Sequence, residues 1–123
     1  MKKLLLILIC LFLSFEVKSK SDDLSGKKLV CENEYEIYGF NFLDTIQVKR
    51  IRIDIQKGIS YSNDFSYKTT PVEISIGGLS TIDRLTLKLN RKTECKLIED
   101  NFDSYMDDRL EMIVNEIKSK QKI

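Results

Sequence analysis

Histidine and tryptophan are both absent from this chain of 123 residues, and proline occurs only once. Without histidine there is no Ser–His or Cys–His catalytic pair, no histidine-containing zinc site, no histidine-ligated haem and no imidazole pH switch. The motifs GxSxG, HExxH and GxGxxG and the phosphate-binding P-loop are missing as well. These absences exclude the enzyme classes that depend on them, and we expect no catalytic residue, metal site or cofactor.

The residues that are present have an ordinary globular balance. Apolar residues make up 42% of the chain and charged residues 32%, and the formal net charge is +1. Neither disorder nor a collagen-like repeat fits this composition. A chain of this length holds one domain at most.

Residues 1–19 predict a secretory signal peptide. Lys2 and Lys3 precede an unbroken apolar run over residues 4–13, and small residues follow it. A run this short cannot cross a hydrocarbon core, which needs about 20 residues in a helix. A charged start, a short apolar run and a small-residue cleavage site are together typical of export. We therefore expect cleavage after Ser19 and a periplasmic or secreted protein.

The same segment has three other interpretations. A cut after Ser14 or Ser21 fits the same pattern. A buried N-terminal helix is disfavoured by the abrupt polar flanks of the apolar run. Lipidation of Cys10 is disfavoured because a lipoprotein signal needs a small residue directly before its cysteine, and Ile9 stands there.

Cleavage changes the charge that a partner would meet. Residues 1–19 contain three lysines and one glutamate, so their removal changes the formal net charge from +1 to −1. No strong field remains to attract nucleic acid or anionic lipid. We expect no nucleic-acid partner, and contact with a membrane only through the signal peptide during export.

Cleavage also leaves two cysteines, Cys31 and Cys95. Two cysteines in a small exported chain predict one disulfide. A bridge between them closes a long loop, which the chain-entropy model values at about 4 kcal/mol. The alternative of a reactive thiol has no CxxC motif and no histidine to support it.

The mature chain divides into a polar, flexible leader over residues 20–27 and one β domain over residues 28–123. Apolar residues alternate with polar ones in short runs that turn residues interrupt, which is the pattern of half-buried strands. Tyr38, Phe40 and Phe42, for example, fall on one face. The spacing predicts seven or eight short strands in an antiparallel meander, curled into a small barrel or a sandwich.

Three details of the strand pattern can be checked. Ile46 and Val48 stand in one phase and Ile51 and Ile53 in the other, which predicts a β-bulge or bend between them. The polar residues 62–64 separate two short apolar stretches and predict a hairpin tip. Leu85, Leu87 and Leu89 alternate with polar residues and predict another strand.

The C-terminal segment has a different period. Apolar residues recur at steps of three and four, and predict a helix over about residues 101–120: Phe102, Met106, Leu110, Ile113 and Ile117. The run from Ser104 to Asp107 resembles a capping box. We expect the apolar stripe of this helix to cover an open face or end of the sheet.

Short motifs along the mature chain resemble those of a known set of proteins. They are Val30-Cys31, residues 38–42 and 67–70, residues 82–87, and Cys95, after an N-terminal signal. Together they resemble a loose group of small exported proteins of AT-rich marine alphaproteobacteria. The resemblance implies an export compartment and a disulfide, and it implies no activity.

Tyr61, Tyr67 and Arg84 are the candidate contacts for a ligand or partner. The two tyrosines flank the predicted hairpin tip, and they belong to an aromatic-rich set that could line a barrel and hold an apolar or sugar-like ligand. Arg84 could bind a carboxylate or phosphate, or form a structural ion pair with Asp83. Core packing is the competing role for the aromatic residues.

Two charged clusters also have a functional and a structural interpretation. Lys49, Arg50 and Arg52 could form a phosphate or nucleic-acid surface, or simply the polar face of a strand. Acidic residues crowd the start of the helix and could bind a hard cation, or favour the helix N-terminus from a solvated face: Glu99, Asp100, Asp103, Asp107, Asp108 and Glu111. The structural interpretation is preferred for both.

The leading functional hypothesis is an exported β domain that is not an enzyme and binds a protein partner or a small ligand. An inhibitor is one form of it, because small exported domains are often stapled by disulfides. The first alternative is a structural envelope component that assembles through its C-terminal helix. The second is a hydrolase that uses two carboxylates and needs no histidine, with Asp54, Asp64 and Asp83 as candidates.

The signal peptide can be tested directly. We expect the protein recovered from a periplasmic extract to begin near Lys20 when its N-terminus is read by mass spectrometry. An intact Met1 on protein from the cytoplasm, with none exported, would contradict this prediction.

Overall fold

The computed structural model describes residues 23–123. The predicted signal peptide and the first part of the predicted leader lie outside the described residues. The described chain begins with eight strands and ends with one helix: β1 (Lys28–Glu32), β2 (Glu36–Phe42), β3 (Gln47–Asp54), β4 (Ile59–Thr69), β5 (Glu73–Ile76), β6 (Ser80–Asp83), β7 (Lys88–Leu89), β8 (Thr93–Leu97) and α2 (Phe102–Ser119).

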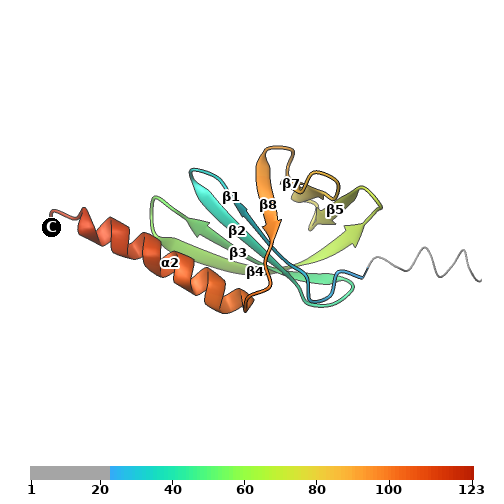
Figure 1. Cartoon of the computed structure of the whole chain (residues 1–123), viewed down its shortest axis with the longest axis horizontal. Coiled ribbons are helices and arrows are strands. Elements are labelled where there is room, and N and C mark those ends of the chain that lie inside the picture. Colours follow the sequence, from blue (N-terminus) through green and yellow to red (C-terminus); the bar gives the residue numbers. More distant parts are fainter. Residues whose placement is uncertain (1–22) are drawn as a thin grey trace, which may run out of the picture.

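The strands form a closed barrel. Each strand pairs in antiparallel fashion with the next one along the chain, and β8 returns to pair with β1. Figure 1 shows the short strands gathered at one end and α2 extending along the other. The prediction of a mainly β meander with a C-terminal helix is confirmed, and of the two architectures the barrel is the one observed.

A disulfide bridges the seam where the barrel closes. Cys31 on β1 lies directly opposite Cys95 on β8, and their sulfur atoms are bonded. Cys31 is completely buried in the barrel core. The predicted pairing is confirmed, and it joins the first and last strands of the sheet.

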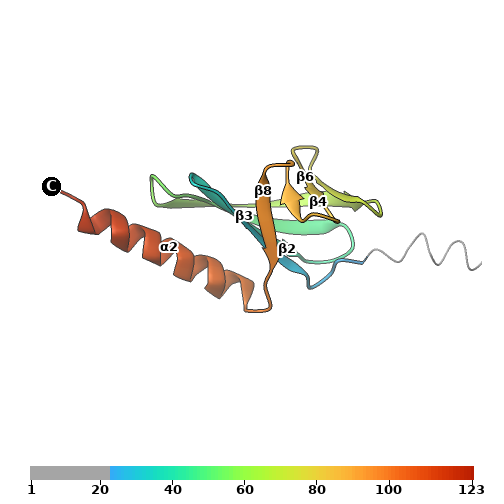
Figure 2. The same ribbon diagram turned by 45° about the horizontal axis from the view of Figure 1, so that its top comes forward.

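The sheet buries apolar side chains on both of its faces, because successive side chains of a strand point to opposite sides. On β2, Phe40 and Phe42 enter the barrel core, while Ile37 joins a second core that α2 completes. Figure 2 shows α2 beneath β2 and β3, away from β6. The molecule therefore has one core inside the barrel and another between sheet and helix.

This second core explains the change of phase in β3. Val48 packs inside the barrel, whereas Ile51 and Ile53 pack towards α2. The pairing of β3 with β2 and with β4 runs without interruption through Lys49 and Arg50. The predicted bulge is therefore wrong: the apolar residues change face because the strand passes from one core to the other.

Two other strand predictions are corrected. Residues 62–64 do not form a hairpin tip, because β4 is one continuous strand of 11 residues that pairs with β3 through them. Residues 84–86 form a turn and Leu87 lies outside any strand, and Leu85 is 77% exposed. A carboxylate oxygen of Asp83 accepts hydrogen bonds from the backbone N–H groups of Leu85 and Thr86, which fixes that turn.

The helix begins one turn earlier than a capping box at Ser104 would place it. Asn101 is the N-cap, and its side-chain oxygen accepts a hydrogen bond from the backbone N–H of Ser104. Phe102, Met106 and Ile113 are buried against the sheet. Assembly with other molecules through this helix would need its apolar stripe to be exposed, but the stripe packs on the sheet of the same chain.

Gly39 on β2 allows α2 to approach the sheet closely. A Cβ atom at this position would lie 2.7 Å from the sulfur of Met106 and 2.9 Å from the ring of Phe102. Two ion pairs hold the helix on either side of this contact, Arg109 with Glu32 on β1 and Asp103 with Lys49 on β3.

The last residues of the predicted leader contact the barrel. Leu24 packs against the barrel core. The backbone N–H of Gly26 donates to the carbonyl of Phe42, and the N–H of Phe42 donates to the carbonyl of Lys27. This short segment extends the sheet at the end of β2 instead of hanging free. Within residues 23–123, no helix combines the length and the apolar character needed to span a membrane.

The contact between Gly39 and α2 can be tested by coupled substitutions. Met106→Ala should lower the free energy of unfolding by about 2–5 kcal/mol, because it leaves a cavity in the second core. Gly39→Ala should also destabilise the protein, because its methyl group would collide with Met106. The double variant should lose less free energy of unfolding than the two single variants together, since the new methyl group enters the space that Met106 vacates. Chemical denaturation measures all three values.

Glu111→Ala is the control, because this side chain is exposed on the outer side of α2. It should change stability little. Strictly additive losses at Gly39 and Met106 would show that the two positions are not in contact.

Candidate functional site

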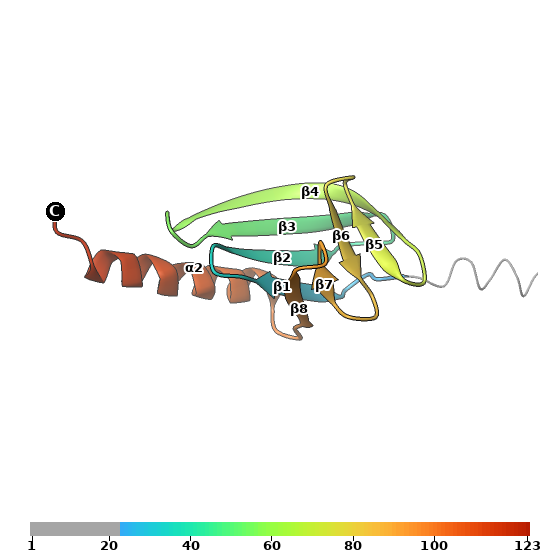
Figure 3. The same cartoon turned by 90° about the horizontal axis from the view of Figure 1, so that it is seen from above.

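Unequal strand lengths create an open surface. Strands β2, β3 and β4 have 7, 8 and 11 residues, whereas β5, β6 and β7 have 4, 4 and 2. The short strands cover only one end of the long ones, and the other end protrudes as an arm (Figure 3). The residues on the side of the arm that continues the barrel interior form what we call the arginine face: Glu36, Tyr38, Arg50, Arg52, Asp54, Ile59, Tyr61, Asn63 and Phe65.

The strand register places Arg52 between two tyrosines. Arg52 lies opposite Tyr38 on one side and opposite Tyr61 on the other. Its guanidinium carbon is 4.5 Å from the centre of the Tyr61 ring. One Nη donates a hydrogen bond of 2.8 Å to a carboxylate oxygen of Glu36. The charge of Arg52 is therefore balanced by Glu36, and this hydrogen bond raises the pKa of Arg52.

Arg50 has aromatic neighbours and no acidic partner within the described chain. Its guanidinium carbon is 4.8 Å from the centre of the Phe65 ring and 6.0 Å from that of Tyr38. Its Nε is buried and has no hydrogen-bond acceptor among residues 23–123. A buried N–H without an acceptor is costly, and more so on a charged group. Among residues 23–123, Arg50 is thus the one residue with a buried side-chain nitrogen or oxygen that has no hydrogen-bond partner.

The local environment also shifts the ionisation of Tyr38. Burial raises the pKa of its hydroxyl above the usual 10.0, and the hydrogen bond and negative charge of Glu36 raise it further. Tyr38 therefore stays neutral over the physiological range and can present its ring to Arg50 as an uncharged surface.

The residues proposed from the sequence do not come together. Tyr61 lies on the arginine face and is 39% exposed. Tyr67 is in the barrel core, and its hydroxyl donates to the backbone carbonyl of Asp44. Burial raises the pKa of Tyr67 as well. Tyr67 is therefore a core residue, and the prediction that it contacts a ligand has no support in this position.

Arg84 lies at the other end of the barrel. It lines an apolar recess of about 160 Å³ beside Leu87 and Leu97, and one of its Nη atoms donates to the carbonyl of Thr70. Asp83 forms the adjacent turn, and backbone hydrogen bonds to its carboxylate lower its pKa. The hydrogen bonds of Arg84 to Thr70 and of Asp83 to its own turn therefore hold the chain together locally.

The other acidic candidates are separated by the fold. Asp54 accepts backbone hydrogen bonds in the turn between β3 and β4, Asp83 does so after β6, and Asp64 lies in the middle of β4. Each of the two turn residues is thus engaged by its own loop. Among residues 23–123, no three acidic or cysteine side chains are grouped so that they could hold a metal ion.

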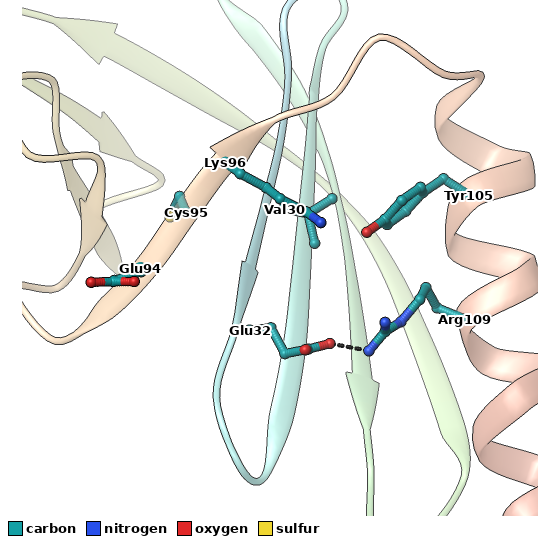
Figure 4. Close-up of a pocket in the computed structure, with 7 residues that line it drawn as sticks. All are labelled: Val30, Glu32, Glu94, Cys95, Lys96, Tyr105 and Arg109. Atoms are coloured by element: carbon teal, nitrogen blue, oxygen red, sulfur yellow. Dashed lines mark hydrogen bonds and ion pairs between the residues drawn. The ribbon is translucent and has the colours of Figure 1, made fainter.

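A second recess lies between α2 and the seam of the barrel (Figure 4). It measures about 270 Å³, and Glu32, Lys96, Tyr105 and Arg109 line it. Its charges have partners: Arg109 pairs with Glu32, and the amine of Lys96 is 5.8 Å from the centre of the Tyr105 ring. These contacts fasten the helix to β1 and β8, so this recess has an evident structural role that the arginine face lacks.

No protein-family model, curated protein or solved structure matches this chain. The chemistry of the arginine face therefore has to be argued from its own residues. The sequence pattern marks Arg50 and Arg52 as a basic run and Tyr38 as one of the aromatic-rich set, but it does not indicate Glu36. Only the pairing of β2 with β3 places these residues together.

The ionisation of Tyr38 gives a prediction for the site. Its raised pKa means that the folded state favours the neutral hydroxyl. The resulting stability should be complete below pH 10.0, the ordinary pKa, and should be lost as the pH rises through the higher folded value. Glu36→Gln should lower the pKa of Tyr38 while burial still keeps it raised. Ring NMR shifts followed against pH measure this change.

Tyr35→Phe is the matched control, because Tyr35 is 60% exposed and lies outside the arginine face. It should leave the Tyr38 titration unchanged. A Tyr38 pKa at or below 10.0 in the parent protein would contradict the described environment.

Proposed function

We propose that this protein is an exported binding domain and not an enzyme. Its arginine face would bind an acidic side chain of a protein partner. The observation that carries the proposal is the cation of Arg50, which lies over two aromatic rings and has no acidic partner among residues 23–123. Because the Nε is buried, a carboxylate of the partner would bind the Nη groups of this half-buried side chain and balance its charge.

The chemistry of arginine favours a carboxylate ligand. The guanidinium is planar, stays charged at all physiological pH values, and presents N–H groups in a fork that matches two carboxylate oxygens. Stacking on Tyr38 and Phe65 holds Arg50 in place, so less conformational freedom is lost when a ligand binds. Arg52 already forms an ion pair with Glu36, so Arg50 is the group that would bind the carboxylate of the partner.

The shape of the surface favours a protein over a small molecule. Small-molecule sites are usually enclosed clefts of about 300–1,000 Å³. The arginine face lies instead on an open sheet beside the exposed residues of β4. Exposed aromatic and arginine side chains are enriched where proteins meet. Tyr61 is such a residue, and it lies at the rim of this face.

Two features support export. The N-terminal sequence fits a signal peptide. The disulfide between Cys31 and Cys95 suits an oxidising compartment. A domain that works outside the cytoplasm can use this bridge for stability while its binding surface stays open.

An acidic peptide tests the proposal. We expect a short glutamate-rich peptide to shift the NMR signals of Tyr38, Tyr61 and Phe65, and a lysine-rich peptide of equal length to leave them unchanged. Arg50→Gln should weaken binding of the acidic peptide at least about tenfold, which is the loss expected for a hydrogen bond to a charged group. Free glutamate at the same carboxylate concentration distinguishes a small ligand from a peptide.

Lys68→Gln is the matched control, because it removes the same charge from an exposed position on β4 outside the arginine face. It should leave binding within about twofold of the parent protein, because surface charges are largely screened at physiological salt. Equal losses for Arg50→Gln and Lys68→Gln would show that only net charge matters and would refute the proposed site.

A further inference from the structure

One edge of the arm is unpaired along most of its length. Residues 59–66 of β4 pair with β3, but β5 joins β4 only from Tyr67 to Thr69. Figure 3 shows the arm half of β4 as the outermost strand. Residues 59–64 are all exposed. An edge of this kind presents free backbone N–H and C=O groups to any chain that can pair with it.

The hydrogen bonds at the end of this edge identify the groups that point outwards. The N–H of Tyr67 donates to the carbonyl of Ile46 on the β3 side, and the carbonyl of Ser66 accepts from Gly77 on the β5 side. Backbone groups of successive residues in a strand point to alternate sides. The N–H and C=O groups of Ser60, Ser62 and Asp64 therefore point away from β3.

The edge has little of the protection that monomeric proteins use. Lysine, proline, bulges and inward charges commonly keep edge strands apart. Residues 59–66 contain no lysine and no proline, and Asp64 is their only charged residue. The pairing with β3 is regular throughout, so no bulge bends the edge away.

We propose that β4 pairs in antiparallel fashion with β4 of a second copy of this chain, with the two-fold axis at Ser62. Ser62 then faces Ser62 of the second copy, and Ser60 faces its Asp64. In this register all three outward-pointing residues form hydrogen-bonded pairs. On the arginine face, Ile59 lies opposite Phe65 of the second copy, which joins an exposed apolar side chain to a half-buried one.

The free edge fits a second copy because it is symmetric about Ser62. Its outward groups lie at residue 62 and two residues to either side, and the turn at Gly58 and the start of β5 pairing at Tyr67 bound it. The two Asp64 carboxylates would be separated by about 13 Å along the strands, a distance over which salt screens most of their repulsion. The pairing thus satisfies the edge without bringing like charges together.

This inference does not rest on the proposed function. The two-fold axis would be perpendicular to the sheet, so the arginine faces of both copies would lie on the same side of one continuous sheet. Oligomeric state can be measured with no ligand present, and peptide binding can be measured on a monomeric variant. Failure of either proposal would therefore be visible separately.

A pair of cysteine variants tests the register. In a hydrogen-bonded antiparallel pair the Cα atoms lie about 5.5 Å apart, within reach of a disulfide. Ser62→Cys should therefore form a disulfide-linked dimer under mild oxidation, seen on a non-reducing gel. Ser60→Cys is the matched control, because it has the same exposure and points to the same face. Its two copies would be more than about 7 Å apart and should cross-link at least tenfold more slowly.

A proline variant tests the edge without a cross-link. The N–H of Ser62 points away from β3, so Ser62→Pro removes no bond between β3 and β4. We expect the parent protein to show a concentration-dependent dimer by analytical ultracentrifugation, and Ser62→Pro to stay monomeric with an unchanged circular dichroism spectrum. A parent protein that is monomeric at every concentration would overturn the proposal. So would equal cross-linking of Ser60→Cys and Ser62→Cys.

Discussion

Pairing of β1 with β8 is the interaction on which the other features of this fold depend. It brings the two ends of the strand sequence together, and the disulfide between Cys31 and Cys95 fixes it covalently. Because the intervening strands β5 to β7 are short, the closed part of the barrel is short as well. The longer strands β2, β3 and β4 must then extend beyond it, which produces the arm, its arginine face and its free edge.

A protruding sheet exposes both of its faces, and a face that carries apolar side chains has to be covered. The helix covers one, and Gly39 lets it lie close enough for Met106 and Phe102 to pack on β2. The other face remains open, and its residues change from apolar inside the barrel to cationic and aromatic on the arm. Stacked arginines suit this boundary, because their flat faces pack on rings while their N–H edges still seek acceptors.

The arginine face and the β4 edge share one strand but differ in chemistry. The face offers a charged side chain, Arg50, whose buried N–H lacks an acceptor within residues 23–123. The edge offers backbone groups, which carry no preference for charge. The proposed acidic partner would be selected by its carboxylate, and the proposed second copy by its ability to pair as an extended strand. Both proposals therefore concern association.

Much of the architecture followed from the sequence alone. The alternating pattern predicted an antiparallel β meander, and the period of three and four predicted the helix. The two cysteines that the expected cleavage leaves predicted the bridge. The periodicity of strands and helices is a local property, and the disulfide follows from the number of cysteines. Both can therefore be recognised without knowledge of the fold. The choice of barrel over sandwich was decided only by tertiary pairing, because the same alternation serves both.

The tertiary structure also decided which side chains are buried, which are exposed and which lie side by side. In the sequence, the change of phase between Val48 and Ile51 looks like a β-bulge. The structure shows regular pairing there, and the phase changes because each face of the strand packs into a different core. Tyr61 and Tyr67 share a face of β4, yet one reaches solvent and the other is buried, because the barrel closes between them. Arg50 meets Tyr38 only through the register of β2 and β3, a long-range property that no local pattern encodes.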